Sequence, residues 1–217
     1  HAYALYGQAH VLTGNTADAA ELADRLADEA AGTHDPATRA TALLIRSAIE
    51  STSGDAARST ALAQEAHDLA AGAGDDYLRY WAALSLGTSA RMLGQPEVAL
   101  ANLQEALSLA EAAGDPYRRS TALYQLSVLQ LTLKNGPAAL AASLAAYRDG
   151  DAARSAYAMV NGRIAESAVM ELLERPAREL AAMEEALAIA RTARSEVAEA
   201  RALVNLSDIR LRRKQYA

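Results

Sequence analysis

Hydrophobic and polar positions along this chain follow the period of the α-helix. Asp75 is an N-cap residue type and predicts a first helix over 76–92, which Leu93-Gly94 ends. Pro96 then begins a second helix, since proline is well tolerated in the first turn. The apolar residues of this second helix lie on one face of a helix with 3.6 residues per turn: Ala99, Leu100, Leu103, Ala106, Leu107 and Ala110. The segment 75–114 therefore predicts two helices joined by a short turn.

This two-helix pattern repeats every 40 residues through the whole chain. The pair Leu86-Gly87 has counterparts at 6–7, 46–47, 126–127, 166–167 and 206–207, and the second residue is always Gly or Ser. A cap-forming residue recurs at Asp35, Asp75, Asp115, Ser155 and Ser195, and a mostly small apolar residue at Leu26, Ala66, Ala106, Ala146 and Ala186. A fixed period of this length is the signature of stacked repeats. It predicts eleven helices and no strand: five pairs and a last unpaired helix over about 196–214. The small residues predict close helix packing.

Two segments depart from the pattern. Asp149-Gly150-Asp151 predicts that the second helix of the fourth unit ends early, and Asn161-Gly162 predicts an interruption of the next helix. The fifth unit also carries Glu166 and Glu179 where apolar or small residues are expected. Because the 40-residue spacing continues across these segments, we interpret residues 1–217 as a single repeat domain.

The run Leu86-Gly87, Gly94, Ala99, Leu103 and Ala106 resembles the tetratricopeptide repeat (TPR), in a long 40-residue form. The style of the sequence is similar to the helical-repeat arms of large bacterial regulators. The resemblance implies an all-α, right-handed α-solenoid of about five and a half TPR-like helix pairs. It also implies a concave face, lined mainly by the first helix of each pair, that holds a peptide or protein partner.

On this resemblance, side chains between the packing columns of the first helices should contact the ligand. The predicted binding residues are Gln8, Thr41, Trp81, Thr88, Arg91, Thr121, Tyr124, Asn161 and Asp208, and Arg201 falls on the same face. Trp81 and Tyr124 are large, rigid side chains of a kind enriched at binding hot spots. The alternative for Trp81, the only tryptophan, is a packing role in the core between repeats. The face lacks the Lys/Asn array with which TPRs clamp a C-terminal carboxylate.

Composition argues against most chemistry in this segment. The chain has no cysteine, and its four histidines, His1, His10, His34 and His67, do not stand at metal-binding spacings. We expect no catalytic residue, metal or cofactor. Residues 1–109 hold six basic and fourteen acidic side chains, against fifteen and thirteen in 110–217. This balance argues against a nucleic-acid ligand. No membrane span or signal peptide is visible, so a cytoplasmic location is expected.

Three functions stay open at this point. The first is a scaffold or sensor arm that binds protein or peptide in a larger bacterial regulator. The second is a small-ligand sensor of a transcriptional activator, which a deep pocket near Trp81, Arg91 and Tyr124 would favour. The third is a non-catalytic arm of an enzyme such as a cyclase or kinase. Both ends fall inside helical patterns, which favours the interpretation of a fragment. An apolar strip on the last helix predicts self-association through that end.

Overall fold

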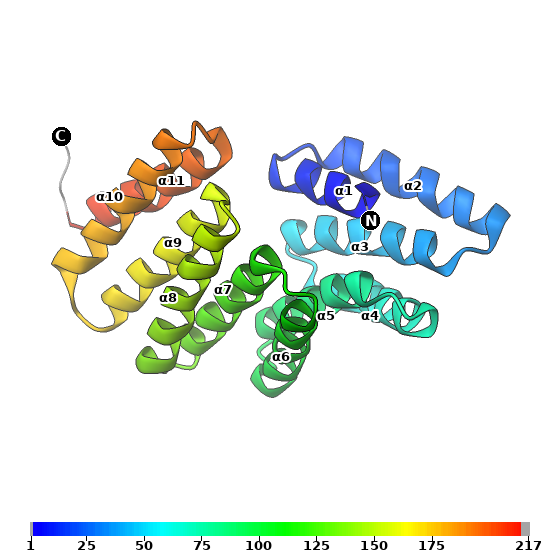
Figure 1. Cartoon of the computed structure of the whole chain (residues 1–217), viewed down its shortest axis with the longest axis horizontal. Coiled ribbons are helices and arrows are strands. Elements are labelled where there is room, and N and C mark those ends of the chain that lie inside the picture. Colours follow the sequence, from blue (N-terminus) through cyan, green and yellow to red (C-terminus); the bar gives the residue numbers. More distant parts are fainter. Residues whose placement is uncertain (1, 214–217) are drawn as a thin grey trace. The chain divides into compact units, whose positions relative to one another are not determined.

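The chain folds into α-helices that alternate between the first and the second helix of a repeated pair. The computed structural model describes residues 2–213, except the side chains at 4, 5, 8, 9 and 12. Within this range there are eleven helices and no strand, as the sequence predicted (Figure 1). The first helices of the pairs, here called A helices, are α1 (Ala2–Leu12), α3 (Pro36–Ser53), α5 (Asp76–Met92), α7 (Pro116–Thr132), α9 (Ala156–Leu172) and α11 (Glu196–Arg212). The B helices are α2 (Thr16–Thr33), α4 (Ala56–Ala73), α6 (Pro96–Ala112), α8 (Gly136–Ala152) and α10 (Pro176–Thr192).

Contacts within the chain define two compact units, residues 1–109 and 110–217, called unit 1 and unit 2 and described separately. In unit 1, α1 contacts α3 and α3 contacts α5, and in unit 2, α7 contacts α9 and α9 contacts α11. Each A helix also packs on a B helix of its own unit. The A helices of a unit therefore form one continuous layer. The assignment of residues 1–217 to a single domain stays a prediction.

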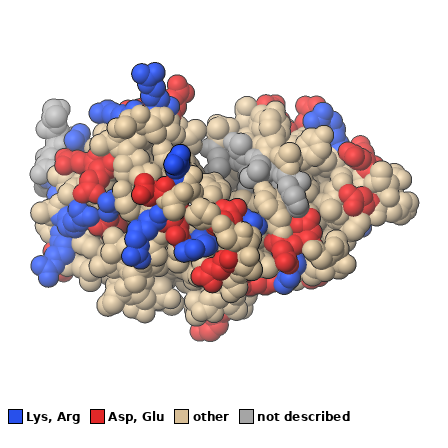
Figure 2. All heavy atoms as spheres, viewed as in Figure 1, with Lys and Arg blue, Asp and Glu red and all other residues tan. Residues whose placement is uncertain are grey.

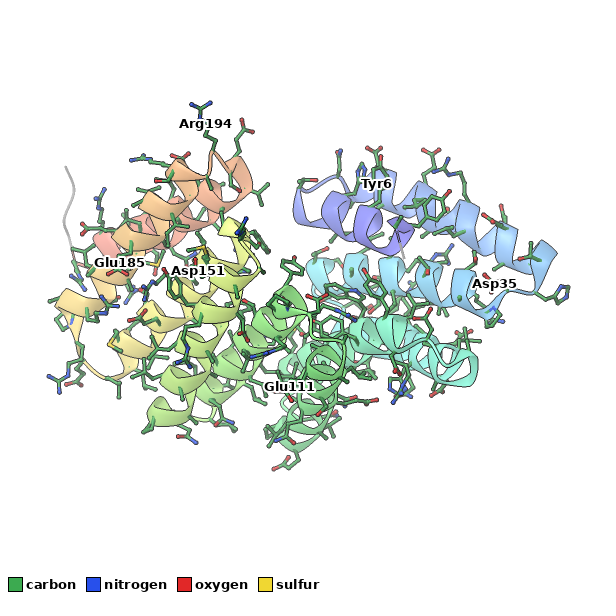
Figure 3. The ribbon with its side chains drawn as sticks, in the orientation of Figure 1. Tyr6, Asp35, Glu111, Asp151, Glu185 and Arg194 are labelled. Carbon is green, nitrogen blue, oxygen red and sulfur yellow. The ribbon has the colours of Figure 1, made fainter. Side chains whose placement is uncertain are left out.

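The predicted caps are present at the start of the A helices. The Asp75 carboxylate accepts a hydrogen bond from the backbone N–H of Leu78 at 3.0 Å, and the Ser155 hydroxyl oxygen accepts one from Ala158 at 3.2 Å. Asp35, Asp115 and Ser195 accept from their own first turns in the same way. Figure 3 shows Asp35 at the start of α3. Each cap satisfies an N–H group that the helix itself leaves unpaired.

Every described helix–helix connection contains one residue in the left-handed conformation, at intervals of 20 residues. Glycine fills this position at 14, 54, 74, 94 and 114, where its missing Cβ removes the steric penalty of a positive φ. His34 and, in unit 2, Lys134, Arg154, Glu174 and Arg194 adopt the same conformation with φ between 51° and 58°. Each of these five connections therefore carries backbone strain that a glycine would relieve.

At Ser47, Gly87, Ser127 and Ser167 the column of Gly and Ser residues is a close-packed seam between an A helix and its B helix. Ser127 and Ser167 are buried, and their hydroxyls donate to the carbonyl oxygens twelve residues on, Ala139 at 2.8 Å and Glu179 at 3.1 Å. Ser47 bonds the carbonyl of Ser59 at the same offset. A Cβ on Gly87 would lie 2.6 Å from Leu103 Cγ. The predicted close packing is confirmed, and the residues of the alanine column are buried as well.

Both predicted helix interruptions are wrong. Helix α8 continues through Gly150 to Ala152, and α9 runs through Gly162 without a break. A Cβ on Gly162 would lie 2.7 Å from the Tyr147 backbone nitrogen, and one on Gly150 would lie 2.7 Å from that of Met159. These glycines allow α8 and α9 to approach each other closely. Tertiary packing therefore outweighs their low helix propensity, which is about 1 kcal/mol below that of alanine.

The two unexpected carboxylates are buried in ion pairs of unit 2. Glu166, 2% exposed, pairs with Arg163 of its own helix at 2.5 Å and with Arg178 of α10 at 2.7 Å. Glu179 pairs with Arg212 and Arg213. The bond from Arg178 to Glu166 raises the pKa of the guanidinium above its ordinary value, although burial opposes the shift. These charges hold α9, α10 and the end of α11 together, and the cost of burying the carboxylates is offset by two arginines each.

Candidate functional site

The surface of the A-helix layer carries the residues that the sequence singled out. In each unit we call this surface the A-helix face. In unit 1 its residues are Thr41, Trp81, Thr88 and Arg91, and in unit 2 they are Thr121, Tyr124, Tyr157, Asn161, Arg201 and Asp208. The side chain of Gln8, also predicted here, lies outside the described residues. Because the two units are described separately, each half of this face is considered alone.

Three threonines of the face bond their own helices. The hydroxyls of Thr41, Thr88 and Thr121 donate to the carbonyl oxygens of Ala37, Leu84 and Tyr117, four residues back, at 2.9–3.0 Å. Thr41 is also buried. These hydroxyls therefore use their proton inside the helix and can only accept a hydrogen bond from a ligand.

The unit 1 half of the face contains an aromatic cluster. The Trp81 ring lies edge-on to Tyr80, with centroids 4.8 Å apart, and to Tyr77, with centroids 6.3 Å apart. Trp81 is only 7% exposed, which agrees with its alternative role in packing. Its indole Nε1 is buried and has no hydrogen-bond partner in the protein. A buried N–H without an acceptor costs about 1–3 kcal/mol, and a ligand acceptor that reached this N–H would recover that cost.

Arg91 lies at the C-terminal end of α5 on the same half. It is half-buried, its Nε has no hydrogen-bond partner, and none of the described carboxylates pairs with it. The Nε of Arg79 on the same helix is unpaired as well, but its terminal nitrogens pair with Asp76 at 2.9 Å and with Glu105 at 2.8 Å. Arg91 therefore keeps a positive charge on the face that the described chain does not neutralise.

The unit 2 half holds a polar cluster drawn from all three A helices. Arg201 on α11 donates to the hydroxyl of Tyr157 on α9 at 3.2 Å and to that of Tyr124 on α7 at 3.4 Å. Its guanidinium carbon lies 5.3 Å from the centre of the Tyr157 ring, within cation–π range. Asn161, 8% exposed, presents a buried side-chain oxygen that has no partner in the protein. The structure thus brings together Tyr124, a predicted binding residue, Arg201, which the sequence placed on the same face, and Tyr157, which it did not single out.

Asp208 is the remaining predicted residue of this half. It is exposed and accepts a hydrogen bond from Arg212 Nε at 3.0 Å, one turn further along α11. Its charge is therefore paired with that of the Arg212 guanidinium.

A cavity of about 470 Å³ lies elsewhere in unit 1, between α2, α3 and α4. Its walls are mostly alanine and leucine, and its charged groups are already engaged: Arg39 pairs with Glu65, Arg46 pairs with Asp24, and Asp35 caps α3. The cavity contains none of the predicted binding residues. Of its polar lining side chains, the exposed His34 imidazole is the one without a described partner, and a single such group does little to orient a ligand.

Charged side chains are distributed unevenly over the surface. In the view of Figure 2 the blue side chains gather mainly over α9–α11 on the left, as the basic excess of residues 110–217 requires. Among the described residues, no group of three or more His, Asp or Glu side chains is placed to hold a metal ion. Within the same range, every helix is too short or too polar to cross a lipid bilayer.

Comparison with solved structures defines the class of fold as a TPR-type helical-repeat solenoid, which confirms the resemblance seen in the sequence. The chain is similar to a Rap protein crystallised with Competence and Sporulation Factor, with a TM-score of 0.81 and 14% identity over 95% of this chain and 61% of that one. It is also similar to a signal-transduction ATPase (STAND) protein with a tetratricopeptide repeat sensor from Pyrococcus horikoshii, with a TM-score of 0.67 and 16% identity over 97% of this chain and 33% of that one. The chain thus spans about three-fifths and one-third of these two structures.

No protein-family model matches the chain, and no curated protein matches it either. At 14–16% identity the structural likeness concerns the fold alone.

Proposed function

We propose that this protein binds an extended peptide or a protein segment on its A-helix face, as the sensor or interaction arm of a larger bacterial regulatory protein. The observation that carries the proposal is the set of polar groups on this face that the protein itself leaves without partners. They are Trp81 Nε1, Arg91 Nε, Asn161 Oδ1 and Arg201 Nε. Buried polar groups are normally paired in folded proteins, and unpaired ones call for an explanation such as a ligand.

The set contains both donors and an acceptor, which suits a peptide. A peptide backbone offers a carbonyl oxygen and an N–H at each residue, so within unit 2 a donor such as Arg201 Nε and an acceptor such as Asn161 Oδ1 both find partners. A solenoid surface also presents many such contacts along one direction. The similar Rap protein was crystallised in complex with a factor, and the repeats of the similar STAND protein form a sensor. Both relatives support a binding function for this fold.

The spacing of the A helices predicts how many peptide residues separate the contacts with successive helices. Packed helices lie about 8–10 Å apart, and an extended chain advances about 3.3–3.6 Å per residue. A peptide that crosses α7, α9 and α11 should therefore present one side chain to each helix about every third residue. Binding to unit 2 should need about seven residues.

The experiment is selection of binders from a random twelve-residue peptide library, followed by affinity measurements with fluorescence anisotropy. We expect Asn161→Ala to weaken binding of the selected peptides about tenfold, because it removes an acceptor that becomes satisfied only in the complex. The exposed B-helix variants Gln104→Ala and Glu184→Ala are the matched controls and should bind as the wild type does. Selected peptides whose affinity falls with the control variants but not with Asn161→Ala would refute the assignment to the A-helix face.

Self-association through the last helix stays a prediction. Leu203, Val204 and Leu211 are exposed on α11, at 40%, 70% and 54%. If they mediate association, Val204→Glu should shift the sedimentation coefficient toward that of a monomer. A wild-type protein that sediments as a monomer at all concentrations would refute self-association through α11.

A further inference from the structure

The arginines of unit 2 separate into two groups by their counter-ions. Five of them are half-buried, and four of these have a carboxylate within ion-pair distance. Arg118 pairs with Asp115 at 2.8 Å, Arg119 with Asp149 at 3.1 Å, Arg163 with Glu166 and Glu185, and Arg213 with Glu179. The fifth is Arg201, which has no carboxylate partner among the described residues.

Neutral groups hold Arg201 in place instead. The hydroxyls of Tyr124 and Tyr157, which belong to two other helices, accept from its two terminal nitrogens, and the Tyr157 ring lies beneath the guanidinium. A guanidinium has five N–H donors, so these two bonds leave three for another acceptor. Tyrosine hydroxyls orient the group but do not neutralise its charge. The result is a partly desolvated cation, fixed in direction, on the face that we propose as the binding surface.

We propose that Arg201, oriented by Tyr124 and Tyr157, is a recognition subsite for a carboxylate of the bound peptide. This inference rests on the proposed function and names the chemistry of its ligand. A carboxylate matches the planar fork of the guanidinium and its single charge. The other half-buried arginines of unit 2 all pair with carboxylates of the chain itself, whereas the remaining N–H donors of Arg201 are left for a carboxylate of the ligand.

The charges around the subsite favour a carboxylate over a phosphate. A phosphate site normally gathers more than one cation, and Arg201 is the only arginine of the A-helix face among the described residues of unit 2.

The first test uses a small probe and does not depend on any selected peptide. The Nε–Hε signals of the arginines are followed by NMR while N-acetyl-glutamate N-methylamide is added, with the glutamine analogue as control. We expect the Arg201 signal to shift in a saturable way with the glutamate compound alone. Arg210 lies exposed on the same helix and should not respond. An equal response to the glutamine compound, an equal response of Arg210, or a response to inorganic phosphate in place of the carboxylate would overturn the proposal.

The second test uses the peptides selected on the whole protein. Arg201→Gln should lower the affinity of peptides that contain Asp or Glu about tenfold to hundredfold, whereas Arg210→Gln, which removes the same charge, should not. Changing the acidic residue of the peptide to its amide should cause a similar loss with the wild type and no further loss with Arg201→Gln. Circular dichroism and the melting temperature establish that each variant is folded.

The two proposals fail in different ways. Peptides that bind to the A-helix face with no preference for acidic residues, and with unchanged affinity for Arg201→Gln, would refute the carboxylate subsite and leave the proposed function standing. A wild type that selects no peptide would refute the proposed function, and the small-probe titration would then still decide whether Arg201 recognises a carboxylate.

Discussion

Replacing Gly162 by alanine should push α8 and α9 apart. The added Cβ would lie 2.7 Å from the backbone nitrogen of Tyr147 and 2.8 Å from its Cα. These are backbone atoms of a helix, so no side-chain rotation relieves the contact, and one whole helix must move. Overpacking of a well-packed core costs about 1–3 kcal/mol, and we expect the upper part of that range here.

The gain in helix propensity offsets part of this cost. Alanine is about 1 kcal/mol better than glycine inside a helix, so the net destabilisation should be about 1–2 kcal/mol. For a chain of this length each kcal/mol corresponds to about 2–4 °C in the melting temperature. Gly162→Ala should therefore melt about 2–8 °C below the wild type when unfolding is followed by circular dichroism at 222 nm.

Gly72 is the matched control, because a Cβ there would meet no heavy atom within 4 Å. Gly72→Ala should gain helix propensity without a steric cost and therefore raise the melting temperature. Gly150 makes the reciprocal contact, 2.7 Å from the Met159 nitrogen, so Gly150→Ala and Gly162→Ala open the same helix pair. Their costs should sum to more than the cost of the double variant. If Gly162→Ala stabilises the protein as Gly72→Ala does, the close approach of α8 and α9 is refuted.

Three further predictions follow from the turns, the caps and the seam. Glu174→Gly should raise the melting temperature, because φ at this residue is 54° and glycine relieves about 1 kcal/mol of strain; a lower melting temperature would contradict this. Burial alone would raise the pKa of Asp115, but hydrogen bonds from the backbone and side chain of Arg118 outweigh it, and the net pKa lies below its ordinary value. The cap therefore stabilises the fold above about pH 4 and is lost as the pH falls through the lowered pKa. In urea titrations, the free energy of unfolding should fall less between pH 7 and pH 3 for Asp115→Asn than for the wild type. An equal fall in both proteins would refute a role of the Asp115 carboxylate in this pH dependence. Ser127→Trp should lower the free energy of unfolding by about 1–3 kcal/mol or more, because Ser127 is fully buried and its hydroxyl donates to the Ala139 carbonyl. Arg119→Trp should cost less, because the side chain that it replaces is 40% exposed. Equal melting temperatures of these two variants would show that the seam is not close-packed.

The repeat made most of the fold predictable from one sequence. A single aspartate or serine says little, but Asp115 and Ser127 each belong to columns that recur every 40 residues, and each repeat is an independent instance of the same environment. The caps and the seam were predicted because they depend on contacts within one helix pair, and the period reproduces that pair.

Predictions failed where a contact between neighbouring pairs decided the outcome. Gly150 and Gly162 have the local signature of helix breakers, and only the approach of α8 to α9 explains why both helices continue. Glu166 was also unexpected in its column, although its partner Arg178 lies on α10, within the same helix pair. A signal was present in this case, because Arg178 follows Glu166 by twelve residues, the same offset that joins Ser127 to Ala139.

The candidate site was less predictable than the fold, because position on a helix face does not reveal which polar groups are already in use. Thr41, Thr88 and Thr121 were predicted as ligand contacts, yet their hydroxyl protons bond their own helices. The roles of Tyr157 and Arg201 depend on distances between three helices. No periodicity in the sequence shows that an arginine has two tyrosine hydroxyls and no carboxylate beside it.

The charged residues of unit 2 differ in whether the scaffold uses them. Glu166 and Glu179 depart from the repeat, but each meets two arginines and joins neighbouring helices, so packing of the solenoid accounts for them. Arg201 occupies a column that holds Thr121 and Asn161 in the two preceding repeats of the unit, so an uncharged side chain fits there. Its charge joins no carboxylate of the described chain, although its hydrogen bonds tie α11 to Tyr157 on α9 and to Tyr124 on α7. Departures from a consistent repeat that the scaffold does not need are where function is expected, and this separates Arg201 from every ion-paired arginine of the unit.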